Sequence, residues 1–418
     1  MRKVPNLALA SVLAAGISAA GLTTAFAEGA ENQPRPILNE FIQTALIDHP
    51  QLAAAEADLS AARARARGQS RPLYNPEVEF DYEDGDVVTK QIGLAQTFDW
   101  SGKRRARYGA ATAEIELAEA RYLTSRKALL SALLASLSDY NTFLKALQIA
   151  DRRVELSAEF LQLAERRNKA GDIPRSEMLT ARLALAEAKA ARNEAQSDLS
   201  MAKEQLVAIA GGDHALWPML EGVPARVSAT LDPSMIQELL RNLPELEVAS
   251  QQTQISRTRI KVAQKERNPD PTVGVRYGEE GSSTLVGVSL SIPIPVLNNY
   301  KDGVDEARAG LVGSEQSYLD ARRRAEARLT ASYDRYKMSL DNWLDWQGEV
   351  QQLLFEQRHL IQRLWKLGEI TAPDYLVQLN QTFTTERASA ELHGRLWKDW
   401  FQWLDASGAT VEWTENLQ

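Results

Sequence analysis

Apolar residues recur at alternating steps of four and three along two long segments of the chain. The first stripe follows Gly102 and consists of Leu133, Leu137, Tyr140, Leu144, Leu147, Val154, Ala158 and Leu161. The second consists of Leu329, Tyr333, Tyr336, Leu340, Trp343, Val350, Leu354, Ile361 and Leu364. Asp151 takes one position of the first stripe, and Gln347 and Gln357 take two of the second. The spacing is typical of coiled-coil helices, and no proline interrupts either segment. One continuous helix over 103–169 would be about 100 Å long, a length that few globular domains can use.

Each long helix is followed by a reversal and a return helix. Apolar stripes predict the return helices over about 175–210 and 373–406. Gly171 stands two residues after Lys169, and Gly368 stands two residues after Lys366. A glycine at this position is typical of a helix C-terminus before a tight turn. The sequence therefore predicts two long helical hairpins.

Two pairs of short segments alternate with a period of two. In 77–83, Val78, Phe80 and Tyr82 share one face, and the other face is acidic, with Glu77, Glu79, Asp81 and Glu83. In the second pair, apolar residues at 273–277 and 286–292 stand opposite Gly, Ser, Thr and Arg276. Short polar connections near 84–86 and 281–282 predict that each pair is a β-hairpin.

The two halves of the chain repeat one plan at nearly constant spacing. The matching segments are 49–52 with 243–246, 92–98 with 286–292, and 171–179 with 368–376. The predicted division is a signal peptide (1–27), a first repeat (28–211), an inter-repeat linker (212–233), a second repeat (234–406) and a C-terminal tail (407–418). The first repeat contains a strand hairpin at about 74–100 and a long helical hairpin at about 103–210. The second contains a strand hairpin at about 271–293 and a long helical hairpin at about 302–406.

The first 27 residues are typical of a secretory signal. Arg2 and Lys3 precede an apolar stretch at 7–22 and a small-x-small site at 25–27. An uncleaved membrane anchor is the alternative. No later apolar run reaches the roughly 20 residues of a membrane-spanning helix, so we expect an exported chain whose only possible membrane-spanning elements are β-strands.

Composition limits the chemistry further. The chain has 418 residues, a formal net charge of -8 and no cysteine. We therefore expect no nucleic-acid partner, and disulfides, thiolate metal sites and a cysteine nucleophile are excluded. The four histidines form no metal-binding pair, and no phosphate loop, dinucleotide fingerprint or nucleophile elbow is present. We expect no catalytic, cofactor-binding or metal-binding residues, no cofactor, and a protein that is not an enzyme.

Four strands per chain cannot close into a barrel. Open strand edges in a bilayer would leave backbone groups without hydrogen-bond partners, so a membrane-inserted sheet must be shared between copies. Two copies would supply 8 strands and three would supply 12, and periodicity leaves this number open. The alternative is a soluble sandwich with one wetted face, which shows the same alternation.

At this point the chain resembles the TolC family of outer-membrane efflux proteins. The resemblance rests on the duplicated plan, on the breaks at 97–103 and 292–296 between strand and long helix, and on the paired Gly-x-Ile turns. It implies a mostly α fold with a small β part, in which duplicated helical hairpins form a trimeric α-helical barrel capped by a shared 12-stranded transmembrane β-barrel.

The resemblance also implies a location and partners. The homotrimer would lie in the Gram-negative outer membrane, contact its lipid, and extend through the periplasm to a periplasmic adaptor protein and an inner-membrane efflux pump. It would act as a passive exit duct for small solutes. The Ile-Pro-Ile-Pro segment at 292–295 is similar to the branch that serves heavy-metal cation exporters. The alternative is an exported coiled-coil scaffold or stalk without a pore.

Family resemblance assigns functional residues to the turns between the long helices. The periplasmic tip that contacts the adaptor would consist of Gly171, Asp172, Ile173, Pro174, Gly368, Glu369, Ile370 and Thr371. Asp374 would line the closed aperture, with Glu177 as its partner in the first repeat. Relatives can carry a second acid where this chain has Val377, so a double acidic ring is not expected. Asp374 could instead help to start the return helix, as acids near helix N-termini do.

The acidic strand face provides one further candidate site. If Glu77, Glu79, Asp81 and Glu83 point into a lumen, they would form a negative ring that favours cations. The alternative is that this face is simply exposed to water without selecting ions, and that Arg276 partly neutralises its charge.

Overall fold

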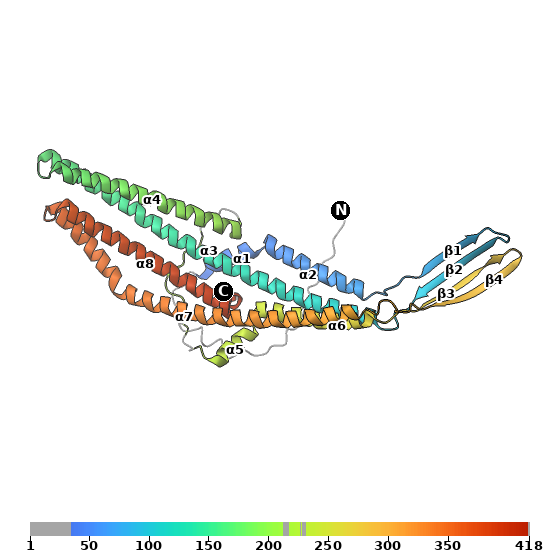
Figure 1. Ribbon diagram of the computed structural model, residues 1–418. Coiled ribbons are helices and arrows are strands. Elements are labelled where there is room, and N and C mark those ends of the chain that lie inside the picture. Colours follow the sequence, from blue (N-terminus) through green and yellow to red (C-terminus); the bar gives the residue numbers. More distant parts are fainter. Residues whose placement is uncertain (1–34, 212–216, 226, 228–230, 417–418) are drawn as a thin grey trace.

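The computed structural model describes residues 35–211, 217–225, 227 and 231–416. The predicted signal peptide at 1–27 and part of the predicted linker at 212–233 lie outside these residues. The described chain is elongated, with a small sheet at one end and the turns of two long helical hairpins at the other (Figure 1). The mostly α architecture with a small β part agrees with the sequence prediction.

Long helices dominate the described part of the chain. In chain order they are α1 (Arg35–Leu46), α2 (Pro50–Gln69), α3 (Lys103–Ala170), α4 (Arg175–Ala210), α5 (Pro233–Arg241), α6 (Pro244–Glu266), α7 (Lys301–Leu367), α8 (Ala372–Ser407) and α9 (Thr410–Glu415). The strands are β1 (Glu77–Glu83), β2 (Thr89–Thr97), β3 (Thr272–Glu280) and β4 (Ser283–Ser291). The order helix, two strands, long helix and return helix thus occurs twice, with α2 to α4 matched by α6 to α8.

The helix α3 is the centre of the helical body, because it packs against α2, α4, α6 and α8. Its predicted apolar stripe is buried at Leu133 and Leu137. Toward the hairpin turn the buried positions differ from the prediction. Ala158 is exposed, and Phe160 and Ala164 are buried instead. The stripe changes register in this region, so one heptad pattern does not describe the whole helix.

Alanines mark the face of α4 that packs on α3. Ala181, Ala188, Ala195 and Ala202 are buried at intervals of seven residues. Such short side chains allow two helices to lie close together, because the distance between helix axes depends on the side chains at the contact.

The largest core surrounds the middle of the molecule. It joins α1, α3, α7 and α8 with the segment after the first repeat, and its fully buried members include Ile42, Leu130, Leu329, Trp400 and Trp403. We call this group the belt core. Residues 407–418, predicted only as a tail, include the helix α9, whose Trp413 contacts the rings of Trp400 and Phe401.

A second buried cluster lies next to the hairpin turns. It contains Phe160, Ala164 and Ala181 of the first hairpin, together with Ile361, Trp365, Ala372, Tyr375, Leu376, Leu379 and Phe383 of the second. We call this group the tip core. Because both hairpins contribute to it, the two turns are joined by apolar contacts within one chain.

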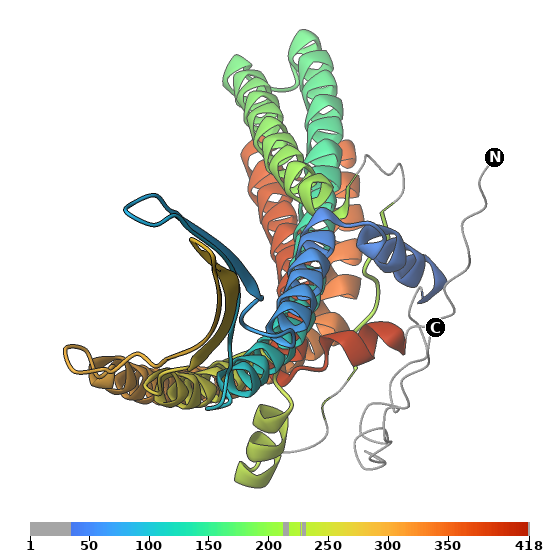
Figure 2. The same cartoon turned by 90° about the vertical axis from the view of Figure 1, so that its right-hand side faces the viewer.

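The sheet is antiparallel, with the strand order β1-β2-β3-β4. The two hairpins therefore lie side by side, and β1 and β4 form the edges. Seen along the molecule, the sheet is strongly curved (Figure 2). Its two edges are not paired to each other, so the single chain forms an open arc rather than a closed barrel.

Candidate functional site

One face of the sheet is an uninterrupted apolar band. The register pairs Val78 with Leu94, Leu94 with Val275, and Val275 with Val288. Beside this row, Phe80, Ile92, Tyr277 and Val286 form a second one. These side chains face solvent in the single chain, and Phe80 and Val286 are 76% and 77% exposed. A soluble sandwich would bury such a face within the chain, so its cover must come from outside.

The opposite face carries acids, small residues and one arginine. Glu77, Glu79, Asp81 and Glu83 share it, as their period of two predicts. Next to them stand Gly93 and Ala95 on β2, and Gly274 and Gly278 on β3. A Cβ added at Gly93 would meet the Arg276 side chain at 3.1 Å and that of Glu79 at 3.5 Å. The missing side chain thus lets Arg276 lie across β2 toward Glu79, which supports partial neutralisation of the acidic face.

Strands and long helices are joined rigidly at Asp99. Its carboxylate accepts hydrogen bonds from the backbone N–H groups of Gly102, Lys103 and Arg104, at 2.7 to 2.9 Å. Burial alone would raise the pKa of Asp99, but these three donors hold it below its usual value. The first turn of α3 is therefore capped by a residue that directly follows β2.

A buried ion pair strengthens the same junction. Lys103 Nζ lies 2.9 Å from Asp270 Oδ2, and the side chains are only 11% and 3% exposed. The Tyr74 hydroxyl donates to the same oxygen at 2.7 Å. The hydrogen bond to Asp270, followed by burial, raises the pKa of Tyr74 to about 12. The Asp270 carboxylate, just before β3, thus binds Tyr74 just before β1 and Lys103 at the start of α3.

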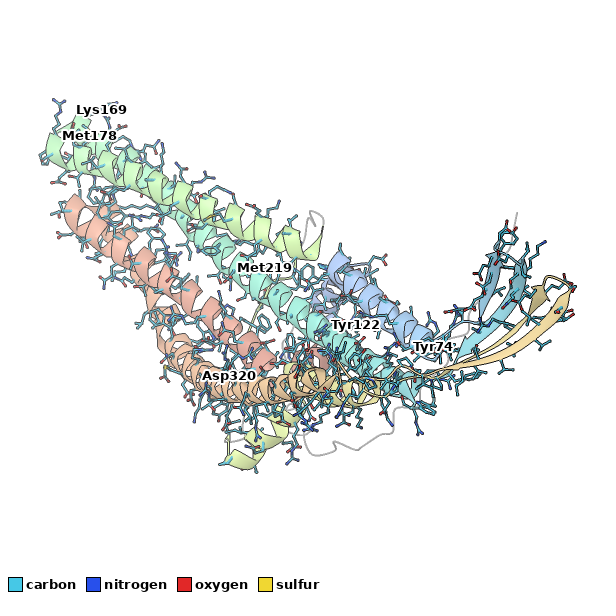
Figure 3. All side chains as sticks on the ribbon, turned by 45° about the vertical axis from the view of Figure 1, so that its right-hand side comes forward. Tyr74, Tyr122, Lys169, Met178, Met219 and Asp320 are labelled. Atoms are coloured by element: carbon cyan, nitrogen blue, oxygen red, sulfur yellow. The ribbon has the colours of Figure 1, made fainter. Side chains whose placement is uncertain are left out.

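The two predicted tip turns have the same backbone design. Gly171 and Gly368 end α3 and α7 in the left-handed conformation, with φ of 84° and 79°. In each turn the glycine N–H and the next N–H bond back to carbonyls of the last helical turn. The predicted tip residues lie together at the end of the molecule remote from the sheet, the end at which Figure 3 labels Lys169 and Met178. Ile173 and Ile370 pack against the tip core, and the other six predicted tip residues are exposed.

Thr371 is the N-cap residue of α8, and Asp374 in the first turn supports this cap in the single chain. The Thr371 hydroxyl donates to its carboxylate at 2.6 Å and accepts from its backbone N–H at 3.3 Å. This reciprocal pair stabilises the N-terminus of α8, which is the alternative role that the sequence suggested. The carboxylate is nevertheless exposed, as is Val377 one turn further along.

Glu177 and Arg167 connect the first turn to the second. Glu177 Oε2 accepts from the backbone N–H of Ala372 at 3.4 Å, at the start of α8. Arg167 Nη2 donates to the carbonyls of Trp365 and Lys366 at 3.0 and 3.1 Å, at the end of α7. Its guanidinium also lies 4.7 Å from the centre of the Trp365 ring. An anion caps the helix N-terminus and a cation caps the helix C-terminus, the favourable arrangement for helix dipoles.

The contacts of Glu177 and Arg167 hold the two hairpin turns together, and only Glu177 is singled out by the sequence. The sequence predicts Glu177 at the gate beside Asp374. Glu177 belongs to α4 and Asp374 to α8, and their carboxylates bond to different groups near the start of α8, the Ala372 N–H and the Thr371 hydroxyl. Arg167 was not predicted. Its only signal is an arginine four residues before Gly171, in a stretch where charged residues are common.

The described residues contain neither a metal-binding cluster nor a membrane-spanning helix. Among them, no group of three His, Asp or Glu side chains is placed to hold a metal ion. Over the same ranges, every helix lacks the length and hydropathy that a membrane span would need.

The sequence of the first half matches a known family. Residues 41–212 match the family model described as outer membrane efflux protein. The cobalt-zinc-cadmium resistance protein CzcC of Cupriavidus metallidurans is 24% identical over 255 residues. That alignment covers 60% of this chain, and the chain spans 61% of the length of that relative.

Solved channel structures share the fold of nearly the whole chain. The match to CusC, a protein studied for its transmembrane channel formation, has a TM-score of 0.73 at 16% identity and covers 89% of this chain and 92% of that one. The CmeC outer membrane channel of Campylobacter jejuni gives 0.74 at 15% identity, with 91% and 89% covered. The open-state MtrE outer membrane channel of Neisseria gonorrhoeae gives 0.73 at 16%, with 90% of each chain covered.

Proposed function

We propose that this chain, whose residues 41–212 match the model of the outer membrane efflux protein family, is the outer-membrane channel of a tripartite efflux or secretion system. It is a passive exit duct for small solutes and carries out no catalytic step. An inner-membrane pump delivers the solutes, and a periplasmic adaptor joins the pump to the duct. The outer-membrane location predicted from the sequence is that of the family.

The single observation that carries the proposal is an apolar band on a sheet that does not close. The band crosses all four strands and is exposed, while β1 and β4 remain open edges. Lipid is the environment that covers such a face, and strand pairing with other copies is what satisfies such edges. Three copies pool 12 strands, which leaves room for a lumen, whereas the interior of an 8-stranded barrel is filled by side chains.

The segment after β4 supports a position at the membrane surface. Ile294, Val296 and Leu297 are almost fully exposed and continue the apolar band of β4 toward the helices. Trp100 stands at the same end of the sheet, because its indole N–H donates to the carbonyl of Pro269 just before β3. Tryptophan is enriched where a membrane protein crosses from lipid to water.

We assign the adaptor contact to the two hairpin turns, residues 171–174 and 368–371. They are largely exposed at the end of the helical body remote from the sheet, which is the end that would project furthest into the periplasm. Asp374 and Glu177 lie directly behind these turns. In a trimer they would bring negative charge toward a common axis, where the copies repel each other and attract cations, so that closure of the aperture depends on pH and ionic strength.

Divalent metal cations are the proposed cargo. Two observations support this class: the 24% identity over 255 residues to a protein named for cobalt, zinc and cadmium resistance, and four acids on one face of β1. A wall of carboxylates raises the local concentration of cations in a lumen.

The deciding experiment combines fractionation with conductance. We expect a heat-modifiable trimer in detergent extracts of outer membranes, and discrete conductance steps when that trimer is added to a planar bilayer. A protein recovered only from the soluble periplasm, without conductance, would support the rival function of an exported coiled-coil stalk. Deletion of the gene, followed by growth on graded zinc, cobalt and cadmium, then tests the cargo separately.

A further inference from the structure

A groove of about 450 Å³ lies where α3, α7 and α8 meet. Along α8 it spans residues 386–393, between Phe383 of the tip core and Leu396 of the belt core. It is therefore far from the acidic strand face and separate from the hairpin turns. The two apolar cores do not fill this level of the helical body, which leaves space between the helices.

An ion-pair cluster occupies one wall of the groove. The Glu386 side chain is 10% exposed and forms ion pairs with Arg358 and, at 3.8 Å, with Arg152. Within the described residues, neither carboxylate oxygen of Glu386 accepts a well-directed hydrogen bond, and Arg358 Nε is buried without an acceptor. Glu386 and Arg358 thus keep unsatisfied hydrogen-bonding groups although they already form an ion pair with each other.

Lys145 adds another cation to this wall. His393 Nε2 lies 2.9 Å from the carbonyl oxygen of Gly222, so Nε2 carries the proton and donates it. The other ring nitrogen, Nδ1, is then an acceptor for the Lys145 ammonium at 3.4 Å. Burial, followed by the charge of Lys145, lowers the pKa of His393 to about 4, so this ring is neutral at neutral pH.

Among the described side chains that line the groove, the balance of charge is positive. Of these described side chains, Lys145, Arg152 and Arg358 are cationic and Glu386 alone is anionic. Burial lowers the pKa of Lys145, against the opposing effect of Glu221. An anion placed beside Lys145 would reverse that penalty, because a nearby opposite charge favours the charged form.

The remaining wall is apolar and aromatic. Ile149 of α3 and Trp343, Leu354 and Phe355 of α7 line it. An open groove of several hundred cubic ångström that combines an apolar wall with a few polar groups has room for a small molecule.

We propose that this groove binds an amphipathic organic anion. Its carboxylate or sulfonate head lies between Lys145 and Arg152, and its aromatic or aliphatic body packs against Trp343 and Phe355. The inference requires only the folded protein and does not depend on the exit-duct function. A bound molecule would bridge α3 and α7 between the two cores.

The test uses the full-length protein in lipid nanodiscs and titration calorimetry with naphthalene-2-sulfonate, with protein-free nanodiscs as the blank. We expect saturable binding of the sulfonate, and binding at least about tenfold weaker for the uncharged analogue 2-naphthalenemethanol, because charge-assisted hydrogen bonds are the strong ones. Lys145→Met should weaken sulfonate binding by about tenfold or more on the same ground.

A matched variant separates the site from general charge effects. Arg153→Met removes the same charge as Arg152→Met from the adjacent position of α3, but Arg153 donates to Asn380 and does not line the groove. We expect Arg152→Met to weaken binding and Arg153→Met to leave it unchanged. Circular dichroism establishes that each variant is folded. The proposal is overturned by absence of saturable sulfonate binding, by equal binding of the uncharged analogue, or by unchanged binding in both Lys145→Met and Arg152→Met.

Discussion

Arg167 is the contact whose removal should most directly loosen the hairpin turns. Its guanidinium binds two carbonyls in the last turn of α7, those of Trp365 and Lys366, and stacks on the Trp365 ring. Replacement by methionine keeps much of the aliphatic stem and removes the charge. The only other polar contact described above between the two turns is that of Glu177 with the start of α8.

The size of the effect follows from these contacts. A hydrogen bond that involves a charged group contributes about 1.5–3 kcal/mol, and a solvent-exposed cation over an aromatic ring about 0.5–1 kcal/mol. Both hydrogen bonds come from one nitrogen, and Arg167 is only half-buried, so we expect a net loss of about 1–2 kcal/mol. That loss should raise the equilibrium constant for separation of the turns by about 5- to 30-fold.

Amide hydrogen exchange measures this separation directly. In Arg167→Met, amides at 366–376 should exchange faster by that factor, while amides of the belt core should keep their rates. The trimer in a planar bilayer should also show a higher open probability. Arg166→Met is the matched control, because Arg166 is exposed on the same turn of α3. Equal exchange at 366–376 in the two variants would refute the assigned role of Arg167.

Four further predictions follow from the geometry. Lys103→Met should destabilise the fold by about 3–5 kcal/mol, because it leaves the buried Asp270 carboxylate without its cation; denaturant unfolding measures this, and adding Asp270→Leu should restore part of the loss. His393 has a folded pKa of about 4, below its ordinary value, so its contribution to stability is present above about pH 6.5 and is lost as the pH falls through about 4. His393→Gln should therefore flatten the dependence of the melting temperature on pH in this window. Asp374→Ala and Asp374→Asn should both raise single-channel conductance, whereas an increase in the alanine variant alone would assign the effect to the lost helix cap. Reversal potentials in a salt gradient should show weaker cation preference after substitution by Gln of the four β1 acids, Glu77, Glu79, Asp81 and Glu83.

Periodicity made the local parts of this structure predictable. A period of two correctly grouped Val78, Phe80 and Tyr82 on one face, since side chains alternate across a strand whatever surrounds it. The glycines at 171 and 368 marked the ends of α3 and α7, because the left-handed conformation they adopt is unfavourable for other residues.

Contacts between distant segments were not predictable in the same way. Lys103 and Asp270 are 167 residues apart, and Arg167 and Trp365 are 198 apart, so no local pattern links them. The prediction for Ala158 of α3 was also wrong, because a heptad pattern identifies a stripe but cannot show which neighbouring helix covers it, whereas Leu161 of the same stripe does pack against the tip core. At Phe160 that neighbour is the second hairpin, whose Trp365 and Tyr375 rings lie against it.

Four of the six acids of the sheet stand on β1, which is an edge strand, and the other two, Glu279 and Glu280, end β3. In a tube built by joining copies edge to edge, β1 of one copy would adjoin β4 of the next, whose corresponding face carries Ser289 and Ser291. The negative charge would then run in stripes along the joints between subunits instead of being spread evenly around the wall. Charged edge strands also discourage indiscriminate pairing. Ionic strength and acidity would therefore govern how the subunits come together, and not only which ions pass between them.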